Sequence, residues 1–384
     1  MRMDDSHTRA ETLDLRLQQL ARRGVTIVDP RQTFVDDDVD IARVESGVVL
    51  HPGTRLHGAR TYLSAGVEVG HEGPAVLRDV VLGPRARVAS GFVHGAVLLR
   101  DASLGANAHV RPGTLLEEEA STAHAVGLKH TILMSFVTLG SLINFCDALM
   151  TGGTSRSDHS EVGSGYIHFN YTPWGARGDK ATPSLVGDVP RGVLLRERRI
   201  FLGGSGGMIG PRRVGFGAVA GAGQVLRRDV PADHLSVQTS RTVLRALSTE
   251  LLGPCAPRRE QNIRYIANLE ALRAFYRELR LPRLPGEDEF AGEREVLEAA
   301  IETLSLAIRE RVKRLAAFLE ERGERPPAFR PRPRLPCPLE ITRARARDYV
   351  DHVRWIQGRT DLEANMLRGW LIAIVEDRVQ AEAG

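Results

Sequence analysis

The stretch "FLGGSGGMIGPRRVGFGAVAGAGQVL", residues 201 to 226, has an apolar residue at every sixth position. These residues are Leu202, Met208, Val214, Ala220 and Leu226. Neither the 3.6-residue period of a helix nor the two-residue alternation of a strand selects this spacing, whereas a chain that turns a corner every six residues does. The pattern therefore predicts a parallel β-helix, with each of these side chains pointing into a narrow interior.

The same spacing extends upstream and sets the limits of the predicted β-helix, residues 25 to 240. It recurs at Phe92, Leu98, Leu104, Val110 and Leu116. Glycines follow several interior positions, as at Gly105 and Gly215, where a corner needs a backbone freedom that a β-carbon restricts. The pattern breaks between about 146 and 200, which predicts an inserted loop, and insertions in solenoids often lie on the binding face.

The period changes to three and four residues after position 240, which predicts a helical region over residues 241 to 384. Two amphipathic segments carry it, with apolar residues at Ile266, Leu269, Leu272, Tyr276 and Leu279, and at Leu297, Ile301, Leu304, Ile308, Val312, Leu315 and Leu319. A Pro-rich linker lies at about 324 to 338, and we interpret it as a stiff spacer rather than a polyproline ligand. Residues 1 to 24 are expected to form a helical lead-in. The predicted fold class is mainly β, with an α-helical C-terminal region that packs on the solenoid end or on another subunit.

Composition narrows the functional classes. The 384 residues include 52 Lys and Arg against 48 Asp and Glu, so the formal charge is only +4, and no concentrated basic face points to nucleic acid. The three cysteines are far apart and form no C-x-x-C, which suggests neither a disulfide framework nor a metal site. A charged N-terminus and the lack of a long apolar run indicate a cytoplasmic protein with no membrane span.

Several stretches, taken in order, resemble a known family. They are "LARRGVTIVDPRQTFVDDDVDI", "VVLHPGTRLHG", "VLGPRARV", "ANAHVRPGTLL" and "VGFGAVAGAGQVLRRDVP". Together they resemble the acetyltransferase arm of the bifunctional N-acetylglucosamine-1-phosphate uridyltransferase/glucosamine-1-phosphate acetyltransferase, over residues 14 to 240. The resemblance implies a left-handed β-helix, a homotrimer, an active site between subunits, and acetyl-CoA as acyl donor. No Gly-rich phosphate loop precedes residue 24, so we expect a divergent homologue that lacks the uridyltransferase domain.

Two cations match the family positions that hold the sugar phosphate. Arg111 in "HVRPGT" matches the phosphate-binding arginine, and Lys129 in "VGLKHT" matches its partner lysine. Arg binds phosphate oxygens in bidentate fashion and Lys adds a point charge, so the pair suits an anionic sugar. Without the resemblance, two solvated side chains on a solenoid face would be the simpler interpretation.

The stretch 159 to 185, "HSEVGSGYIHFNYTPWGARGDKATPSL", is interpreted as a ligand platform. Asn170 and Tyr171 match an Asn-Tyr pair that contacts the sugar in the family, and Lys180 is the counterpart of the following lysine. The alternative is that Asn170 and Pro173 only make a turn and that Trp174 caps the core. The segment "GDKATP" within it is a weak phosphate-loop signal, consistent with a nucleotide sugar.

The chain departs from the family at the catalytic base. The family motif H-L-T-Y falls on "SLIN", so the base is replaced by Ser141 and the sugar-binding tyrosine by Asn144. Serine cannot take a proton from an ammonium group near pH 7, whereas acylation of an amine requires a base of matched pKa. His168, two residues before Asn170, is the candidate for a base that has moved, with His130 and His159 as alternatives.

An acyl-CoA, acetyl-CoA or another, would lie along small residues at the coil edges. Gly204 and Ala222 occupy those family positions, and Arg241 is the candidate for the CoA phosphates. The segment "GFGAVA" also fits a dinucleotide fingerprint, but it is in phase with the β-helix and no helix is expected after it.

These residues predict a protein that binds a sugar phosphate or nucleotide sugar of the UDP-N-acetylglucosamine pathway. Transfer of an acyl group from CoA to the amino sugar is the leading expectation. The alternative is a non-catalytic sugar-nucleotide sensor or scaffold, favoured by the missing histidine. No metal site is expected.

Overall fold

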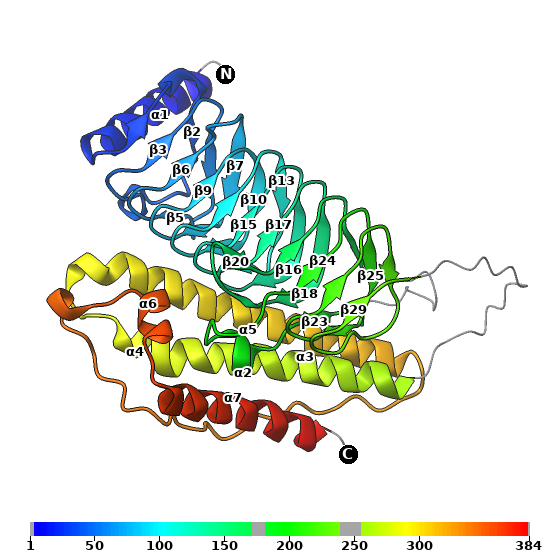
Figure 1. Cartoon of the computed structure of the whole chain (residues 1–384). Coiled ribbons are helices and arrows are strands. Elements are labelled where there is room, and N and C mark those ends of the chain that lie inside the picture. The colour runs from blue at the N-terminus through cyan, green and yellow to red at the C-terminus, as the bar shows by residue number, and fades with distance from the viewer. Residues whose placement is uncertain (1–3, 171–180, 239–254, 383–384) are drawn as a thin grey trace, which may run out of the picture.

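The computed structural model describes residues 4–170, 181–238 and 255–382, and within them the chain forms a parallel β-solenoid followed by helices (Figure 1). Each circuit of the chain is called a coil, and the strands of successive coils line up on three faces. The predicted β-helix with a helical C-terminal region is confirmed. Helix α1 (Asp4–Arg22) lies at the N-terminal end of the solenoid.

The first face is a parallel sheet of eleven strands, one from each coil. Its strands are β1 (Thr26–Ile27), β3 (Val49–Leu50), β6 (Glu68–Val69), β9 (Arg87–Val88), β12 (Ser103–Leu104), β15 (Ser121–Thr122), β17 (Thr138–Leu139), β21 (Glu161–Val162), β24 (Phe201–Leu202), β27 (Val219–Ala220) and β29 (Leu235–Ser236).

The second and third faces share two long strands, β16 (Gly127–Leu133) and β18 (Asn144–Met150), which bend across the corner between them. The other strands of the second face are β2 (Phe34–Val35), β4 (Arg55–His57), β7 (Ala75–Arg78), β10 (Gly91–His94), β13 (Ala108–Val110), β22 (Ile167–Phe169), β25 (Gly207–Ile209) and β28 (Val225–Leu226). Those of the third face are β5 (Tyr62–Leu63), β8 (Val81–Leu82), β11 (Ala96–Leu98), β14 (Thr114–Leu116), β23 (Ser184–Val186) and β26 (Arg213–Val214).

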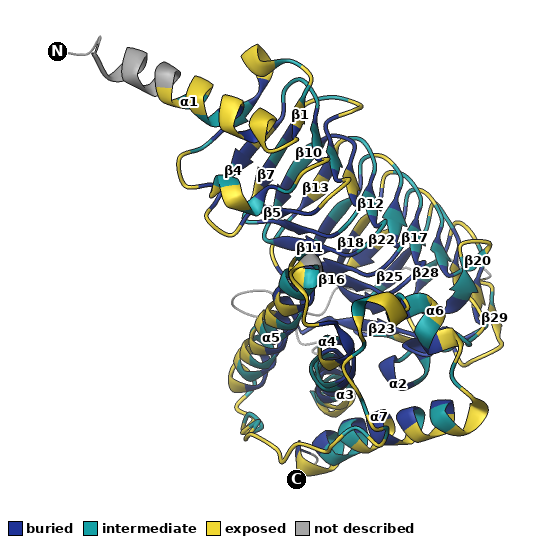
Figure 2. Ribbon diagram, turned by 90° about the vertical axis from the view of Figure 1, so that its left-hand side faces the viewer, coloured by how far each residue is buried: buried dark blue, intermediate teal, exposed yellow. Residues whose placement is uncertain are grey.

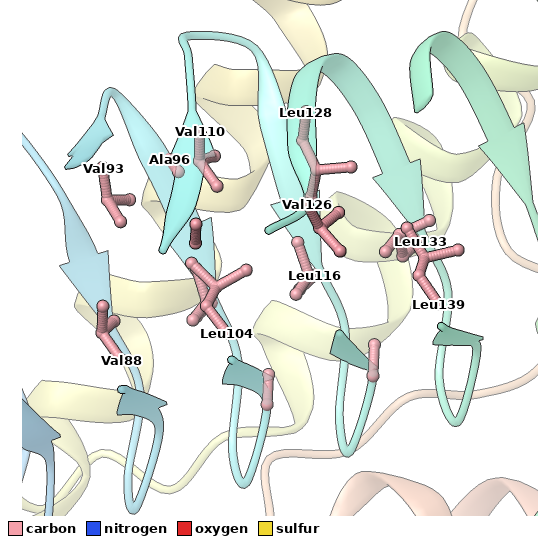
Figure 3. Packing of buried hydrophobic residues seen from close by; sticks show 14 of the residues in the cluster. Val88, Val93, Ala96, Leu104, Val110, Leu116, Val126, Leu128, Leu133 and Leu139 are labelled. Carbon is pink, nitrogen blue, oxygen red and sulfur yellow. The ribbon is translucent and has the colours of Figure 1, made fainter. Parts of the chain in front are cut away.

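The interior is filled as the six-residue spacing predicts, with one correction. Leu98, Leu104, Val110 and Leu116 are at most 1% exposed. Figure 3 shows Leu104, Val110 and Leu116 among the apolar side chains that fill the interior. Phe92, however, lies on the outside, and Val93 takes the interior position. The prediction was wrong here because the spacing from Val93 to Leu98 is five positions, one fewer than the regular six.

The glycines that follow interior residues are required for a different reason from the one expected. Gly105 does not have a positive φ, but a β-carbon on it would lie 2.6 Å from the backbone of Ala123 in the next coil. The positive φ values fall on residues such as Asn107, at the corner itself. Close approach between coils, rather than backbone freedom, therefore requires this glycine.

The interruption at 146 to 200 consists of several excursions between coils that continue through it. The first holds the antiparallel pair β19 (Gly153–Ser155) and β20 (Asp158–His159). Another, between β23 and β24, contains the short helix α2 (Val189–Gly192). The solenoid register is regained each time, because β21 pairs with both β17 and β24.

The helical region packs along the third face of the solenoid rather than on its end, as Figures 1 and 2 show. Its helices are α3 (Cys255–Phe275), α4 (Leu281–Arg283), α5 (Ala291–Glu320), α6 (His352–Gln357) and α7 (Asp361–Glu382), with a π-helical turn at Tyr276–Arg280. The outward residues of the third face are apolar and at most 8% exposed: Tyr62, Val81, Val97, Leu115, Ile132, Leu149 and Leu185. Burying each such side chain contributes about 1.5–3 kcal/mol, so this face is held by a continuous second core.

Candidate functional site

The two cations expected at a sugar phosphate lie next to each other on the second face. Val110 pairs with Leu128, so Arg111 and Lys129, the next residue in each case, occupy equivalent outward positions on adjacent coils. Lys129 pairs in turn with Cys146. Adjacent strands are about 4.8 Å apart, so both cationic groups reach the same small region of the surface.

Neither cation has a carboxylate partner among the described residues. Arg111 donates from Nη2 to the Sγ of Cys146 at 3.6 Å, and its buried Nε has no acceptor. Burial raises the pKa of the Cys146 thiol, so this sulfur is a neutral acceptor and does not balance the charge of the guanidinium. The positive charge of the pair is therefore available to an anion from solvent.

A buried ion pair closes the adjoining corner, where the second face meets the third. Arg311 of α5 contacts Asp147 at 3.0 Å, and both side chains are less than 10% exposed. Asn170 donates from Nδ2 to the other oxygen of Asp147 at 2.8 Å. Arg111 and Asn170 thus reach the neighbouring residues Cys146 and Asp147, so they lie on the same side of the solenoid.

His130 lies at this corner as well. Burial and the charge of Arg311 lower its pKa to about 4, so the imidazole is neutral at physiological pH. Its Nδ1 is buried and has no hydrogen-bond partner in the part of the chain that the structure describes. His159, the other alternative base, lies in β20, where its Nδ1 contacts the carbonyl of Arg156 at 2.8 Å.

The predicted base His168 points into the solenoid interior. It is 1% exposed and lies six residues after the interior residue Val162, so the hexad pattern itself contained this information. Its Nδ1 contacts the carbonyl oxygen of Cys146, which can only accept, and its Nε2 lies 2.8 Å from the Oγ of Ser184. With both nitrogens engaged, no nitrogen is free to accept a substrate proton; its role as a base stays a prediction that this placement does not favour.

Ser141 is paired with an imidazole that the sequence reasoning missed. The Oγ of Ser141 lies 2.9 Å from Nδ1 of His124, an exposed residue 17 positions earlier. That separation is one coil, since Ser121 pairs with Thr138 at the same spacing. A search one coil back from Ser141 would have found it. Asn144 is exposed and lies at the start of β18, on the second face, three residues after Ser141.

Sequence comparison with known proteins gives consistent relatives. A bifunctional protein GlmU of Kineococcus radiotolerans is 31% identical over 217 residues, which is 56% of this chain and 39% of that protein. GlmU of Micrococcus luteus is 33% identical over 221 residues, 58% of this chain and 39% of that protein. The solenoid is homologous to part of GlmU. No family model matches the chain.

The relationship to GlmU is partial. GlmU of Fervidobacterium nodosum is 29% identical over 229 residues, 60% of this chain and 45% of the relative. This chain therefore spans about two fifths of the length of the GlmU proteins it matches.

Gly204 and Ala222, two of the positions expected to hold CoA, belong to a column of small residues at one corner of the solenoid. Backbone hydrogen bonds link successive coils at this corner through Ser141, Ser164 and Gly204 and on to Gly223, beside Ala222. All four column residues, Ser141, Ser164, Gly204 and Ala222, are at least partly exposed. A β-carbon on Gly204 would lie 2.6 Å from the carbonyl oxygen of Ser164, so only glycine fits there. The column adjoins the second face, and its lack of large side chains suits the thin pantetheine arm expected from the GlmU resemblance.

Three predicted residues lie outside the described part of the chain: Tyr171, Lys180 and Arg241. Their roles stay predictions. Within the described residues, no helix is long and apolar enough to cross a membrane. The same residues contain no group of three or more His, Cys, Asp or Glu placed to hold a metal ion.

Proposed function

We propose that the second face binds a phosphorylated or nucleotide-linked amino sugar, with Arg111 and Lys129 holding the phosphate. The observation that carries this proposal is two adjacent cations on one face without a carboxylate partner among the described residues. Asn144, and Asn170 at the corner, supply amide groups for sugar hydroxyls. The partial similarity to GlmU supports a role in the UDP-N-acetylglucosamine pathway.

We further propose that the site transfers an acyl group to the amine of this sugar. Acyl-CoA, held along Ser141, Ser164, Gly204 and Ala222, supplies the acyl thioester. His124 takes the proton of the substrate ammonium, directly or through the hydroxyl of Ser141, since its Nδ1 lies 2.9 Å from that Oγ. The free amine attacks the thioester carbon, so the C–N bond forms and the C–S bond breaks. The imidazolium of His124 gives its proton to the departing thiolate, and the neutral imidazole then takes the second proton from the acylated nitrogen and releases it to solvent.

The alternative function, a non-catalytic sensor or scaffold, rests on Ser141 replacing the family histidine and on His168 facing inward. In that case the second face binds the same ligand without turnover. The helical region, packed on the third face, would then present the bound state to a partner.

The deciding experiment measures binding of glucosamine 1-phosphate by calorimetry and release of CoA from acetyl-CoA with a thiol reagent. Turnover that falls about 100-fold in His124→Asn, with unchanged sugar affinity, supports acyl transfer. Binding without CoA release selects the sensor. Absence of binding contradicts both functions.

Lys129→Met tests the anion site, and Lys313→Met is its matched control. Lys313 is exposed on α5, outside the candidate site, so the control makes the same chemical change there. Losing one charged contact to phosphate typically costs about 1.5–3 kcal/mol, so Lys129→Met should weaken binding at least about tenfold. Equal affinities in the two variants would remove Lys129 from the site.

We also propose a homotrimer assembled through the faces that the helices leave open. On the first face, Phe201 pairs with Val219 and Val219 with Leu235, and these three side chains are 38%, 39% and 68% exposed. An apolar column of this kind is suited to contact between subunits. Sedimentation should give a trimer for the native chain and a monomer for Val219→Glu.

A further inference from the structure

A cavity of about 330 Å³ lies between the solenoid and the helical region, away from the second face. Corners of the solenoid around Pro84, Leu99 and Glu118 form one wall. The other wall comes from the turn after α3, the start of α5 and the segment from Tyr349 to Arg354. This volume lies within the range of small-molecule sites, and the cavity joins parts of the chain that are far apart in sequence.

Most charges in the cavity wall neutralise one another. The wall arginines and their carboxylate partners are Arg85 with Asp101, Arg100 with Glu293, Arg280 with Glu118, and Arg354 with Asp351. Glu117, buried behind Glu118, receives a hydrogen bond from Tyr276 and also faces Arg280. These groups balance internally and do not call for a ligand.

Arg283 is the exception among the wall cations. It is 6% exposed, and no carboxylate among the described residues pairs with it. Its Nη2 donates to the carbonyl oxygen of Val350 at 3.0 Å, and its guanidinium carbon lies 3.9 Å from the centre of the Trp355 ring. Burial lowers its pKa to about 10, so the carbonyl and the ring do not fully offset the desolvation of the charge.

Glu119 is the exception among the wall carboxylates, since it forms no ion pair with any of the described residues. Burial and nearby acids raise its pKa. Within the described residues, the buried Nδ1 of His352 also lines the cavity without a hydrogen-bond partner. Buried polar atoms in native proteins nearly always have partners, so this nitrogen points to a missing polar group.

We propose that this cavity binds a small zwitterion, whose phosphate or carboxylate pairs with Arg283 and whose ammonium pairs with Glu119. The site is separate from Arg111 and Lys129 and does not depend on the function proposed for them. Because the ligand touches both the solenoid and the helices, binding strengthens the contact between the two. The ligand is therefore an effector that controls how firmly the helical region is held.

The test uses the full chain and phosphoethanolamine as probe, with inorganic phosphate and ethanolamine for comparison. Emission of Trp355 reports binding, because its ring lies against the guanidinium that the anion would reach; Trp355→Phe is the spectroscopic control. Saturable change with phosphoethanolamine, at least about tenfold tighter than with phosphate, is expected.

Two variants separate the contributions. Arg283→Met keeps the length of the side chain and removes the charge, and should abolish the response to both phosphate compounds. Replacing a buried unpaired charge by an apolar group does not endanger folding, which the melting temperature checks. Glu119→Gln should leave phosphate binding intact and remove the preference for phosphoethanolamine.

Lys129→Met, at the other anion site, should bind the probe at this cavity like the native chain. An unchanged response in Arg283→Met, or no saturable response in the native chain, overturns the proposal. A response lost only in Lys129→Met assigns the anion to the second face and also overturns it. Equal affinity for phosphate and phosphoethanolamine overturns the zwitterion.

Discussion

The second and third faces of the solenoid share the same coils, and even two of the same strands, yet they do opposite things. Along β16, Lys129 points outward on the second face and remains available to solvent, whereas Ile132 points outward on the third and is fully buried under the helices. Figure 2 shows the C-terminal helices, α3, α5 and α7, together on one side of the solenoid. The interior side chains stabilise the solenoid. The outward side chains determine whether a face packs against the helices or is open to a ligand.

The largest expected effect comes from the corner where these two faces meet. Asp147→Asn keeps the positive φ of 58°, which Asn tolerates, but leaves Arg311 buried without its countercharge. Breaking one side of a buried ion pair costs about 3–5 kcal/mol of unfolding free energy, measured by urea denaturation.

The matched control for this change is Asp377→Asn. Asp377 pairs with Arg332, and both side chains are about two fifths exposed, so its loss should cost less than about 1 kcal/mol. Similar losses in the two variants would show that the corner pair does not hold α5 on the solenoid.

The two faces are compared directly by one substitution made on each. Ile132→Ala removes a side chain that is 0% exposed from the third face, and Ile167→Ala removes one that is 43% exposed from the second. The first should cost about 2–4 kcal/mol because it leaves a cavity beneath the helices, and the second less than about 1 kcal/mol. Chemical denaturation of both variants checks this, and equal costs would contradict the division between a docking face and an open one.

Lowering the pH should destabilise the corner between the second and third faces, where His130 lies. The native pKa of His130 is about 4, below the unfolded value of 6.5, so the unfolded chain binds more protons between these values. Stability from this group is complete above about pH 6.5 and is lost as the pH falls toward 4, by up to about 3 kcal/mol.

His130→Asn should therefore flatten the loss of stability between pH 6.5 and 4. Asn suits the positive φ of 49° at this position. The difference between the native chain and the variant isolates His130, because the pKa of the buried His168 and His352 is lowered in both. Parallel stability curves for the two proteins would contradict the assignment.

The sequence predicted the interior of the solenoid well because most side chains at one position in six are apolar and buried. Leu98, Val110 and Met208 are buried as expected. The error at Phe92 arose where one side of a coil is a residue shorter. The docking of the helices on the third face was not predicted. Val97 and Leu115 directly precede the interior residues Leu98 and Leu116, so they recur with the same period as the interior. The period alone therefore does not show that these outward side chains are covered.

The candidate site was predictable where it depends on chain spacing alone. Arg111 and Lys129 adjoin because a coil places residues 18 apart on neighbouring strands. Contacts across the corner were not predictable, since Arg311 lies on a helix more than 160 residues after Asp147. The contact between His124 and Ser141 could have been predicted from the length of one coil. The inward position of His168 could have been predicted from the six-residue spacing of the interior residues.

The smallest expected effect concerns the open face itself. Arg111→Lys retains the charge but loses the planar fork that binds two phosphate oxygens, so affinity for glucosamine 1-phosphate should fall about fivefold, near 1 kcal/mol. Calorimetry at two salt concentrations separates geometry from charge: the salt dependence should be unchanged, since the number of cations is the same. Arg78→Lys, on the same face two coils earlier, is the control and should leave affinity unaltered. If Arg78→Lys weakens binding as much as Arg111→Lys, the ligand extends along several coils, and the open face recognises an elongated anion rather than a single phosphate.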